Sequence, residues 1–471
     1  MRRTRALLLT VSCIGLLQAW SAGRAGAVVL NNDVAPDTAA AANTYDTGNT
    51  YANVVAIQTQ SGGLCTGTLI NSRTILTAAH CFYNQQTNTF APDSPITVKF
   101  GSNASVPTST VGLSVEPTYS SGGPDIAVLT LSSPVTAITP ATVVGRNNPK
   151  PQVGSLMVTV GYGQYGTGLD AGAYTNNNPV PDAPTDPIRR RFGETLLGIY
   201  GSWTFPTAPP APAGNVFIAQ FRDPQSPAAF DIYGLTAKGF SAPSLQAGNG
   251  GGDSGGPLFL VEPDGSLVLI GDLALLTPDT ASLSGTLRYG TIMGWTSVQD
   301  SLAWLNENNP LREVTAASGN FNWSNPAAWI DSVSGSIDAV PNNQDGSFAA
   351  PFGDPGRFFD VTLSNPGTIT LDMDPTIDTL AIAGTQSRLV LPAGFTLTTV
   401  LSTTLSDGTL TMTGGTLASP EMLISGGLLA GNGTIIAGGG NTDVCSTGVC
   451  NTGGTVMPIG TLAIQGNYTQ T

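Results

Sequence analysis

The chain has 471 residues, with 31 acidic residues against 17 basic ones and a formal net charge of −14. This acidic balance argues against nucleic acid or an anionic membrane surface as a partner. Only 10% of the residues are charged, whereas 58 are glycine and 34 are proline, so we expect many turns and few amphipathic helices. The length allows two or three domains.

The N-terminus has the pattern of a secretory signal peptide. Three arginines within the first five residues precede an apolar run over residues 6–17, and Ala-Gly-Ala at 25–27 has small residues at the offsets that signal peptidase requires. The apolar run is too short to span a membrane, and no later stretch is long and apolar enough. We therefore expect an exported protein that loses residues 1–27 and begins near Val28.

After an irregular arm the chain is rich in short strands. Apolar and β-branched runs at 54–57, 74–76 and 157–160 are separated by turn residues. Such spacing is typical of two antiparallel Greek-key barrels. A segment rich in proline, asparagine and glycine, residues 166–213, interrupts the pattern, and we interpret its three arginines at 189–191 as a solvated surface.

Two single residues in this strand-rich part have contexts that carry chemistry. The one histidine of the chain, His80, follows Leu-Thr-Ala-Ala, and Asp125 leads straight into the apolar run Ile-Ala-Val-Leu. Alone, a histidine is ordinarily a packed or surface residue, and an aspartate before a strand is ordinarily a turn or cap residue. A serine in a glycine-rich loop further along the chain makes a catalytic role for both residues the better interpretation.

That loop is Gly-Gly-Gly-Asp-Ser-Gly-Gly-Pro at residues 250–257, with Ser254 in its middle. Glycines let the backbone turn sharply and approach a bound group closely. The N–H groups of Gly252 and Ser254 are therefore candidate donors to an oxyanion. Serine is a poor nucleophile by itself, and His80 with Asp125 would supply the base and the orienting acid that it needs.

Three segments in this order resemble the trypsin/chymotrypsin-like serine proteases. They are Thr-Ala-Ala-His-Cys at 77–81, Asp-Ile-Ala-Val-Leu at 125–129 and Gly-Asp-Ser-Gly-Gly-Pro at 252–257. Cys-Thr-Gly-Thr-Leu-Ile at 65–70 and Gly-Tyr-Gly at 161–163 are similar to two further segments of that family. A helix-like run near Trp304 is similar to its C-terminal helix.

The resemblance implies an all-β fold, two six-stranded Greek-key barrels of chymotrypsin type over residues 28–312. It also implies a serine endopeptidase acting on protein or peptide substrates through an acyl-enzyme. In this mechanism His80 takes the proton of the Ser254 hydroxyl and Asp125 holds the imidazole tautomer. No metal or organic cofactor is required.

The resemblance extends to specificity and to activation. Gly248 aligns with the base of the primary pocket, while Leu276 and Met293 align with its walls, which implies cleavage after small aliphatic residues. Cleavage after Arg or Lys would instead require an acidic residue from elsewhere, with Asp272 nearest in sequence. In the family, the carboxylate before the nucleophile pairs with a newly formed N-terminus. Asp253 and the Val28 amine are the corresponding pair here, although the residues after Val29 depart from the family pattern.

Four cysteines remain after Cys13 leaves with the leader, an even number that fits an oxidising compartment. The protease family joins the positions of Cys65 and Cys81 by a disulfide. Cys445 and Cys450 are close enough in sequence to close a small loop.

Residues 313–471 differ in composition, with two arginines, no lysine and short β-rich phrases between Gly-Gly and Asn-Gly turns. This pattern is typical of a parallel β-solenoid, in which each coil stacks on its neighbours. The phrases at 322–329, 426–435 and 466–470 resemble repeats of bacterial autotransporter passengers, which implies a secreted or cell-surface protein of Gram-negative type. An autotransporter would continue into an outer-membrane β-barrel, so the repeat region is either incomplete or exported in another way.

Two other functions remain open. An adhesin with a vestigial protease domain would ordinarily have lost a triad residue or its neighbouring glycines, and this chain keeps them all. A serine esterase would use the same triad with a wider acyl pocket.

Overall fold

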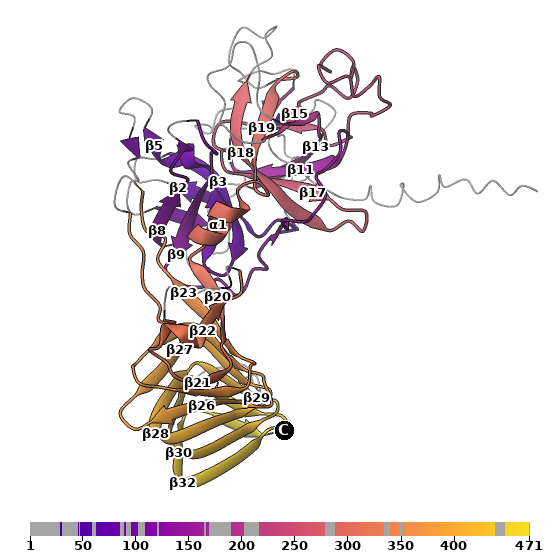
Figure 1. Ribbon diagram of the computed structural model, residues 1–471. Coiled ribbons are helices and arrows are strands. Elements are labelled where there is room, and N and C mark those ends of the chain that lie inside the picture. The colour runs from indigo at the N-terminus through magenta and orange to yellow at the C-terminus, as the bar shows by residue number, and fades with distance from the viewer. Residues whose placement is uncertain are drawn as a thin grey trace, which may run out of the picture.

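The computed structural model consists almost entirely of strands, as Figure 1 shows. It describes residues 29–30, 46, 48–58, 63–84, 89–90, 96–101, 109–119, 122–163, 166–168, 190–201, 216–277, 288–333, 335, 340–348, 352–438 and 448–470. The helices among them are short: η2 (Ala79–Phe82), α1 (Leu302–Asn308) and η4 (Pro326–Ala328). The expected mostly-β composition is thereby confirmed. The signal peptide lies outside the described residues and stays a prediction.

The first sheet has six strands in the order β7-β2-β3-β4-β9-β8, and all neighbours are antiparallel. The strands are β2 (Val54–Gln58), β3 (Leu64–Asn71), β4 (Thr74–Thr77), β7 (Thr97–Lys99), β8 (Thr110–Val115) and β9 (Ala127–Leu131), with the hairpin β5 (Tyr83–Asn84) and β6 (Thr89–Phe90) beside them. β-Branched and aliphatic residues favour strands, and Ile57, Leu69 and Leu129 among them fill a core inside the curled sheet.

The second sheet has the order β13-β11-β17-β18-β19-β15-β14, and β10 pairs with β18. Its strands are β10 (Thr142–Val143), β11 (Leu156–Gly161), β13 (Arg191–Leu196), β14 (Ile199–Gly201), β15 (Val216–Gln220), β17 (Pro257–Val261), β18 (Leu267–Thr277) and β19 (Ile292–Ser297). The sequence predicts six strands here, and the described residues form eight. The difference arises because two connecting segments, β10 and β14, run beside β18 and β15 for two or three residues.

Both sheets are curled half-barrels, which is consistent with a chymotrypsin-like fold. They share one apolar core, to which the first sheet contributes Val54 and Val128 and the second contributes Phe217 and Trp295. Loops from both sheets therefore meet at the seam between them, where the candidate site lies.

The C-terminal sheet has 14 strands, and nearly all its neighbours are parallel. The strands are β20 (Leu311–Ala316), β21 (Gly319–Asn322), β22 (Trp329–Asp331), β23 (Phe358–Leu363), β24 (Gly367–Thr370), β25 (Thr376–Ile382), β26 (Ser387–Pro392), β27 (Thr396–Leu405), β28 (Thr409–Ser419), β29 (Glu421–Ile424), β30 (Leu428–Ala437), β31 (Gly448–Asn451), β32 (Thr455–Gln465) and β33 (Tyr468–Gln470). Leu363 pairs with Ile382, Ile382 with Leu405, Leu405 with Ile424, and Ile424 with Asn451. Inward-facing Leu and Ile side chains of these strands form a separate core.

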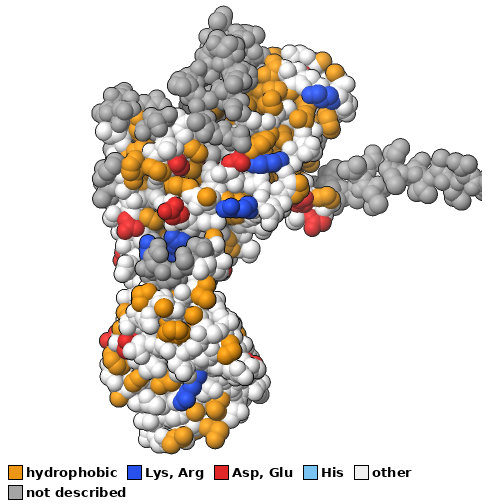
Figure 2. Space-filling view, in the orientation of Figure 1, with side chains coloured by type: hydrophobic (Ala, Val, Ile, Leu, Met, Phe, Trp, Pro, Cys, Tyr) orange, Lys and Arg blue, Asp and Glu red, His pale blue; other side chains and the backbone are white. Residues whose placement is uncertain are grey.

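Charged side chains are sparse on the face of this C-terminal body that Figure 2 shows, as its composition leads us to expect. In Figure 1 the body lies beneath the first sheet, and β32 is at its far end. Met457 and Ile459 on β32 are exposed, at 55% and 74%.

Candidate active site

His80 and Asp125 are brought together by the antiparallel pairing of β4 with β9. Thr77 pairs with Ala127, and each catalytic candidate lies a few residues beyond that pair, His80 in η2 and Asp125 in the turn before β9. The Nδ1 atom of His80 lies 2.6 Å from Asp125 Oδ2, and the backbone N–H of His80 donates to Asp125 Oδ1 at 2.9 Å. Asp125 is buried, whereas the side chain of His80 is 25% exposed. The ring is therefore oriented by a buried carboxylate and still reaches the surface.

The protonation of His80 reflects two opposing effects. Burial lowers the pKa of His80, while the charge of Asp125 and the hydrogen bond to its carboxylate raise it. The attraction wins, so the pKa of His80 is raised above its ordinary value of 6.5. A base with this pKa is neutral only at neutral to alkaline pH.

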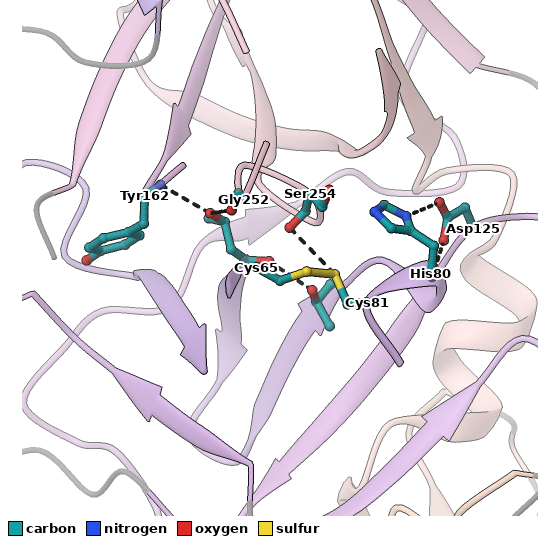
Figure 3. The surroundings of a disulfide bond; sticks show 9 residues. Cys65, His80, Cys81, Asp125, Tyr162, Gly252 and Ser254 are labelled. Atoms are coloured by element: carbon teal, nitrogen blue, oxygen red, sulfur yellow. Dashed lines mark hydrogen bonds and ion pairs between the residues drawn. A yellow bond between two sulfur atoms is a disulfide. The ribbon is translucent and has the colours of Figure 1, made fainter. Parts of the chain in front are cut away.

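Ser254 lies in the turn between β16 (Ala247–Gly248) and β17. Its carbonyl oxygen accepts the backbone N–H of Thr66 at 2.8 Å and lies 3.9 Å from Cys81 Sγ. In Figure 3 Ser254 is drawn above the disulfide and to the left of the His80 imidazole, with Asp125 on the other side of the ring. In this view Ser254, His80 and Asp125 follow one another from left to right.

The glycines around Ser254 are required by the shape of this turn. Gly252 has φ +97° and Gly255 has φ +77°, a region that residues with a Cβ rarely adopt. A Cβ at Gly255 would lie 2.2 Å from Thr77 Oγ1 and 2.4 Å from the carbonyl of Thr66. The hydroxyl of Thr66 donates to the Gly252 carbonyl at 3.0 Å, which ties the turn to β3.

The backbone N–H groups of Gly252 and Ser254 have no acceptor among the described residues. They are the pair that the sequence proposes as oxyanion donors.

Asp253 is fully buried, and its two carboxylate oxygens accept the N–H groups of Gly163 and Gly250, both at 2.7 Å. Burial raises the pKa of Asp253 to about 6, against the opposing effects of these hydrogen bonds and of the Arg191 charge. Val28, the proposed partner amine, lies outside the described residues, so that ion pair stays a prediction.

The chain just after Val28 is nevertheless close to this loop. β1 (Val29–Leu30) runs parallel to β12 (Gly166–Thr167) and antiparallel to β16, where Val29 pairs with Gly248. The N-terminal segment thus forms backbone hydrogen bonds with the strand that leads into the catalytic loop.

The three residues predicted to form the specificity pocket lie on three strands, of which β18 and β19 pair with each other. Gly248 is buried in β16, and Leu276 on β18 pairs with Met293 on β19. A Cβ at Gly248 would lie 2.9 Å from the ring of Phe221, which is itself fully buried. Sequence reasoning missed Phe221, because no local motif links it to a glycine so far along the chain.

Asp272, the acidic residue nearest in sequence to the predicted pocket, is buried close to Asp125. It lies on β18 opposite Thr296, whose hydroxyl donates to the carbonyl of Asp125 at 3.1 Å. Asp272 is 1% exposed, and neither carboxyl oxygen has a partner among the described residues. Burial, and next the charge of Asp125, raise the pKa of Asp272 well above its ordinary value. Burial thus favours the protonated form of this acid, which interacts with the orienting carboxylate.

The disulfide between Cys65 and Cys81 is confirmed, with an S–S distance of 2.08 Å. It ties β3 to η2 directly beneath His80. Cys450 is also disulfide-bonded. Cys445 lies outside the described residues, so the Cys445–Cys450 pairing stays a prediction.

The prediction that Arg189–Arg191 form a solvated surface is wrong for the two that the structure describes. Arg190 and Arg191 are each 6% exposed. Arg190 forms an ion pair with Asp46 at 2.8 Å and donates to the carbonyl of Val54. A run of three like charges looked solvated because its buried partner precedes it by well over a hundred residues.

The described part of the chain contains no cluster of three or more His, Cys, Asp or Glu side chains that could hold a metal ion. Among the same residues, no helix combines the length and apolar character needed to cross a membrane.

Comparison with known proteins agrees with this geometry. A family model described as Trypsin matches residues 43–180, which include His80 and Asp125 and end before Ser254. Snake venom serine protease 5 from Trimeresurus stejnegeri is 30% identical over 115 residues, which are 24% of this chain and 45% of that protein. The match thus spans less than half of that relative. The chain carries a trypsin-like serine protease domain.

Proposed function

We propose that the protein is a secreted serine endopeptidase with the triad His80, Asp125 and Ser254. The observation that carries this proposal is the 2.6 Å contact of His80 with Asp125 beside a glycine turn that presents Ser254. The N–H groups of Gly252 and Ser254, which have no acceptor within the described part of the chain, would donate hydrogen bonds to the oxyanion of the tetrahedral intermediate.

In the proposed reaction, His80 Nε2 takes the proton of the Ser254 hydroxyl as its oxygen attacks a peptide carbonyl. Asp125 keeps the other ring nitrogen protonated and stabilises the imidazolium that forms. His80 then gives the proton to the leaving amine, and water releases the acyl group by the same steps in reverse. The oxyanion accepts hydrogen bonds from Gly252 and Ser254 throughout.

The proposed preference is for small aliphatic residues before the cleaved bond. Gly248, with the ring of Phe221 against it, would form an apolar, uncharged base, and Leu276 and Met293 would be the bulky walls. Asp272, the nearest acidic candidate in sequence, is buried and has Asp125 as its charged neighbour, which argues against a role in binding Lys or Arg. One methylene in such a pocket changes discrimination by only ~1–3 kcal/mol, so the preference should be broad.

The C-terminal body is proposed to be a β-solenoid of the autotransporter-passenger type, over residues 313–471. Parallel ladders such as β23-β25-β27-β29 and β24-β26-β28-β30 support this interpretation, because stacked coils pair each strand with the same strand of the next coil. On this view the protease is presented on a bacterial surface or released from it.

One experiment separates the three candidate functions. The protease proposal expects hydrolysis of casein that is lost in Ser254→Ala. An esterase would cleave short p-nitrophenyl esters and leave casein intact, and an adhesin would do neither. A peptide library then tests specificity, and dominant cleavage after Arg or Lys would overturn the proposed pocket.

A further inference from the structure

The strands that carry His80 and Asp125 are held at their opposite end by the C-terminal body. β4 and β9 pair antiparallel from Thr77 with Ala127 at the catalytic end to Thr74 with Thr130 at the other end. Arg73 directly precedes β4 at that other end. Its carbonyl accepts the N–H of Leu131, the last residue of β9.

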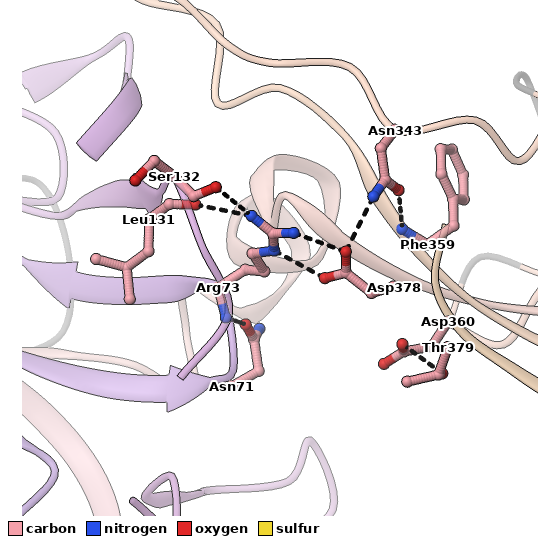
Figure 4. A network of polar contacts seen from close by, with 9 residues as sticks. All are labelled: Asn71, Arg73, Leu131, Ser132, Asn343, Phe359, Asp360, Asp378 and Thr379. Atoms are coloured by element: carbon pink, nitrogen blue, oxygen red, sulfur yellow. Dashed lines mark hydrogen bonds and ion pairs between the residues drawn. The ribbon is translucent and has the colours of Figure 1, made fainter. Parts of the chain in front are cut away.

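The side chain of Arg73 forms a buried ion pair with Asp378 on β25. Nε and Nη2 donate to the two carboxylate oxygens, each at 2.7 Å, and the two side chains are 3% and 0% exposed. This bidentate ion pair, drawn in Figure 4, is the strongest geometry that a guanidinium and a carboxylate adopt. It joins two residues that are 305 positions apart.

The same guanidinium also binds the end of β9. Nη1 donates to the carbonyls of Ser132 at 2.7 Å and Leu131 at 3.3 Å, and the charge lies 3.9 Å from the centre of the Phe358 ring. On the other side, Asp378 accepts a hydrogen bond from Asn343 at 2.9 Å. Arg73 therefore connects β4, β9 and β25 in one buried network.

Further contacts join the segment before β23 to the first sheet and to the β5–β6 hairpin. The hydroxyl of Thr130 donates to the carbonyl of Pro355, and the N–H of Leu113 on β8 donates to that of Ser347 at 3.4 Å. The rings of Phe90 and Phe352 lie 5.6 Å apart. Residues 344–348 and 352–357 thus lie against β8 and β9 of the first sheet.

We infer that the C-terminal body holds the His80–Asp125 pair in register, and that Arg73 and Asp378 are positioning residues for it. The role in catalysis rests on the proposed protease function, whereas the effect on the geometry of His80 does not. A shift of β4 against β9 at Arg73 changes the distance between Nδ1 and the carboxylate at the other end. Misplacement by about 1 Å, even from a distant change, can lower turnover by about 100-fold.

Because the chain has a single histidine, every imidazole signal in NMR spectra of histidine-labelled protein comes from His80. The test uses the full chain with Ser254→Ala to prevent self-cleavage. We expect Asp378→Asn to move or broaden the low-field Nδ1–H resonance and to lower the pKa of His80, since its contact with Asp125 weakens. In the otherwise wild-type chain, kcat should fall about 10- to 100-fold with KM nearly unchanged.

Asp46→Asn is the matched control. It breaks a comparably buried ion pair with Arg190, at 2.8 Å and with side chains 2% and 5% exposed, that binds β2 instead of β4 or β9. It should cost similar thermal stability and leave the His80 resonance in place. Unchanged His80 signals and turnover in Asp378→Asn would overturn the inference.

A second variant covers the case in which Asp378→Asn does not fold. Replacing a buried ion pair by apolar residues is often neutral, so Arg73→Met with Asp378→Leu should fold. It still loses the hydrogen bonds to Leu131 and Ser132, and we expect the same change at His80. A wild-type His80 spectrum in this variant would contradict the positioning role.

A wild-type chain that hydrolyses no peptide would refute the proposed function alone, because the spectra need no substrate.

Discussion

The imidazole of His80 lies between a buried carboxylate and a glycine turn, and its position sets the pH range in which it can act. Burial is the largest single effect on the pKa of His80 and lowers it, but the charge of Asp125 and the hydrogen bond to its carboxylate together outweigh burial and raise the pKa above 6.5. The imidazolium cannot accept the proton of Ser254, so activity is lost as pH falls through that raised pKa.

We expect His80→Ala to lower kcat by about 10⁴-fold or more, because the triad acts as a unit. The acid limb of kcat/KM in the wild-type protein should lie above pH 6.5, at the pKa that NMR gives for the imidazole. Initial rates between pH 5 and 9 check both statements. Retained turnover in His80→Ala, or an acid limb near pH 4, would exclude His80 as the base.

Burial of the Asp272 carboxyl group should lower the stability of the fold, and the effect can be measured. Its two carboxyl oxygens are buried without a partner in the part of the chain that the structure describes, and a leucine, which branches at the same carbon, removes them. We expect Asp272→Leu to raise the free energy of unfolding by about 1–3 kcal/mol, the usual penalty of an unsatisfied buried group. Asp272→Asn, which keeps two polar atoms, is the control and should gain less. Denaturant unfolding measures this free energy. A lower free energy of unfolding in Asp272→Leu than in the wild type would mean that the carboxyl group has a partner.

At the scale of elements, the catalytic residues are joined to their strands by short, constrained connections. Gly255 and Gly256 lead from the nucleophile into β17, and η2 follows β4 after a single residue. The Cys65–Cys81 disulfide closes the path from β3 through β4 to η2.

We expect removal of that disulfide to destabilise the protease unit more than the C-terminal body. Closing a loop of roughly 15 residues contributes about 3 kcal/mol in the chain-entropy model. In a Cys65→Ala, Cys81→Ala variant, hydrogen exchange should rise first in β3, β4 and η2. An equal rise in hydrogen exchange across β23 to β30 would contradict this prediction, because it would show that the two bodies lose stability together.

At the scale of the whole molecule, buried acids make stability depend on pH. Burial raises the pKa of Asp253 to about 6 and that of Asp360 to about 6, from 3.8 in the unfolded chain. Between these values the folded state holds protons that the unfolded state has released, so stability falls as pH rises from about 4 to about 6. His80 acts in the same direction at higher pH, since its pKa is raised on folding.

The melting temperature should therefore be higher near pH 5 than at pH 7.5. Asp253→Asn should flatten this dependence, whereas Asp264→Asn, at an exposed position with a lowered pKa, should leave it unchanged. Thermal unfolding of the Ser254→Ala chain at several pH values provides the measurement. A melting temperature that rises steadily up to pH 7.5 would contradict the assignment of neutral buried acids.

What the sequence by itself determined lies in contiguous segments. The strand pattern around β2, β4 and β11, the glycine turn at Ser254 and the Cys65–Cys81 disulfide follow from local spacing and from a family resemblance carried by five short motifs. Strand periodicity and backbone freedom at glycine are properties of neighbouring residues, so they can be read without a fold.

Only the tertiary structure decided which charges are buried and what they meet. Arg190 with Asp46, Arg73 with Asp378, and Asp272 near Asp125 have no local signature, because their partners are up to 305 residues away. Burial is set by the packing of one sheet on another and not by composition. The C-terminal body consequently became visible as a support of β4 and β9 only once its strands were paired in space.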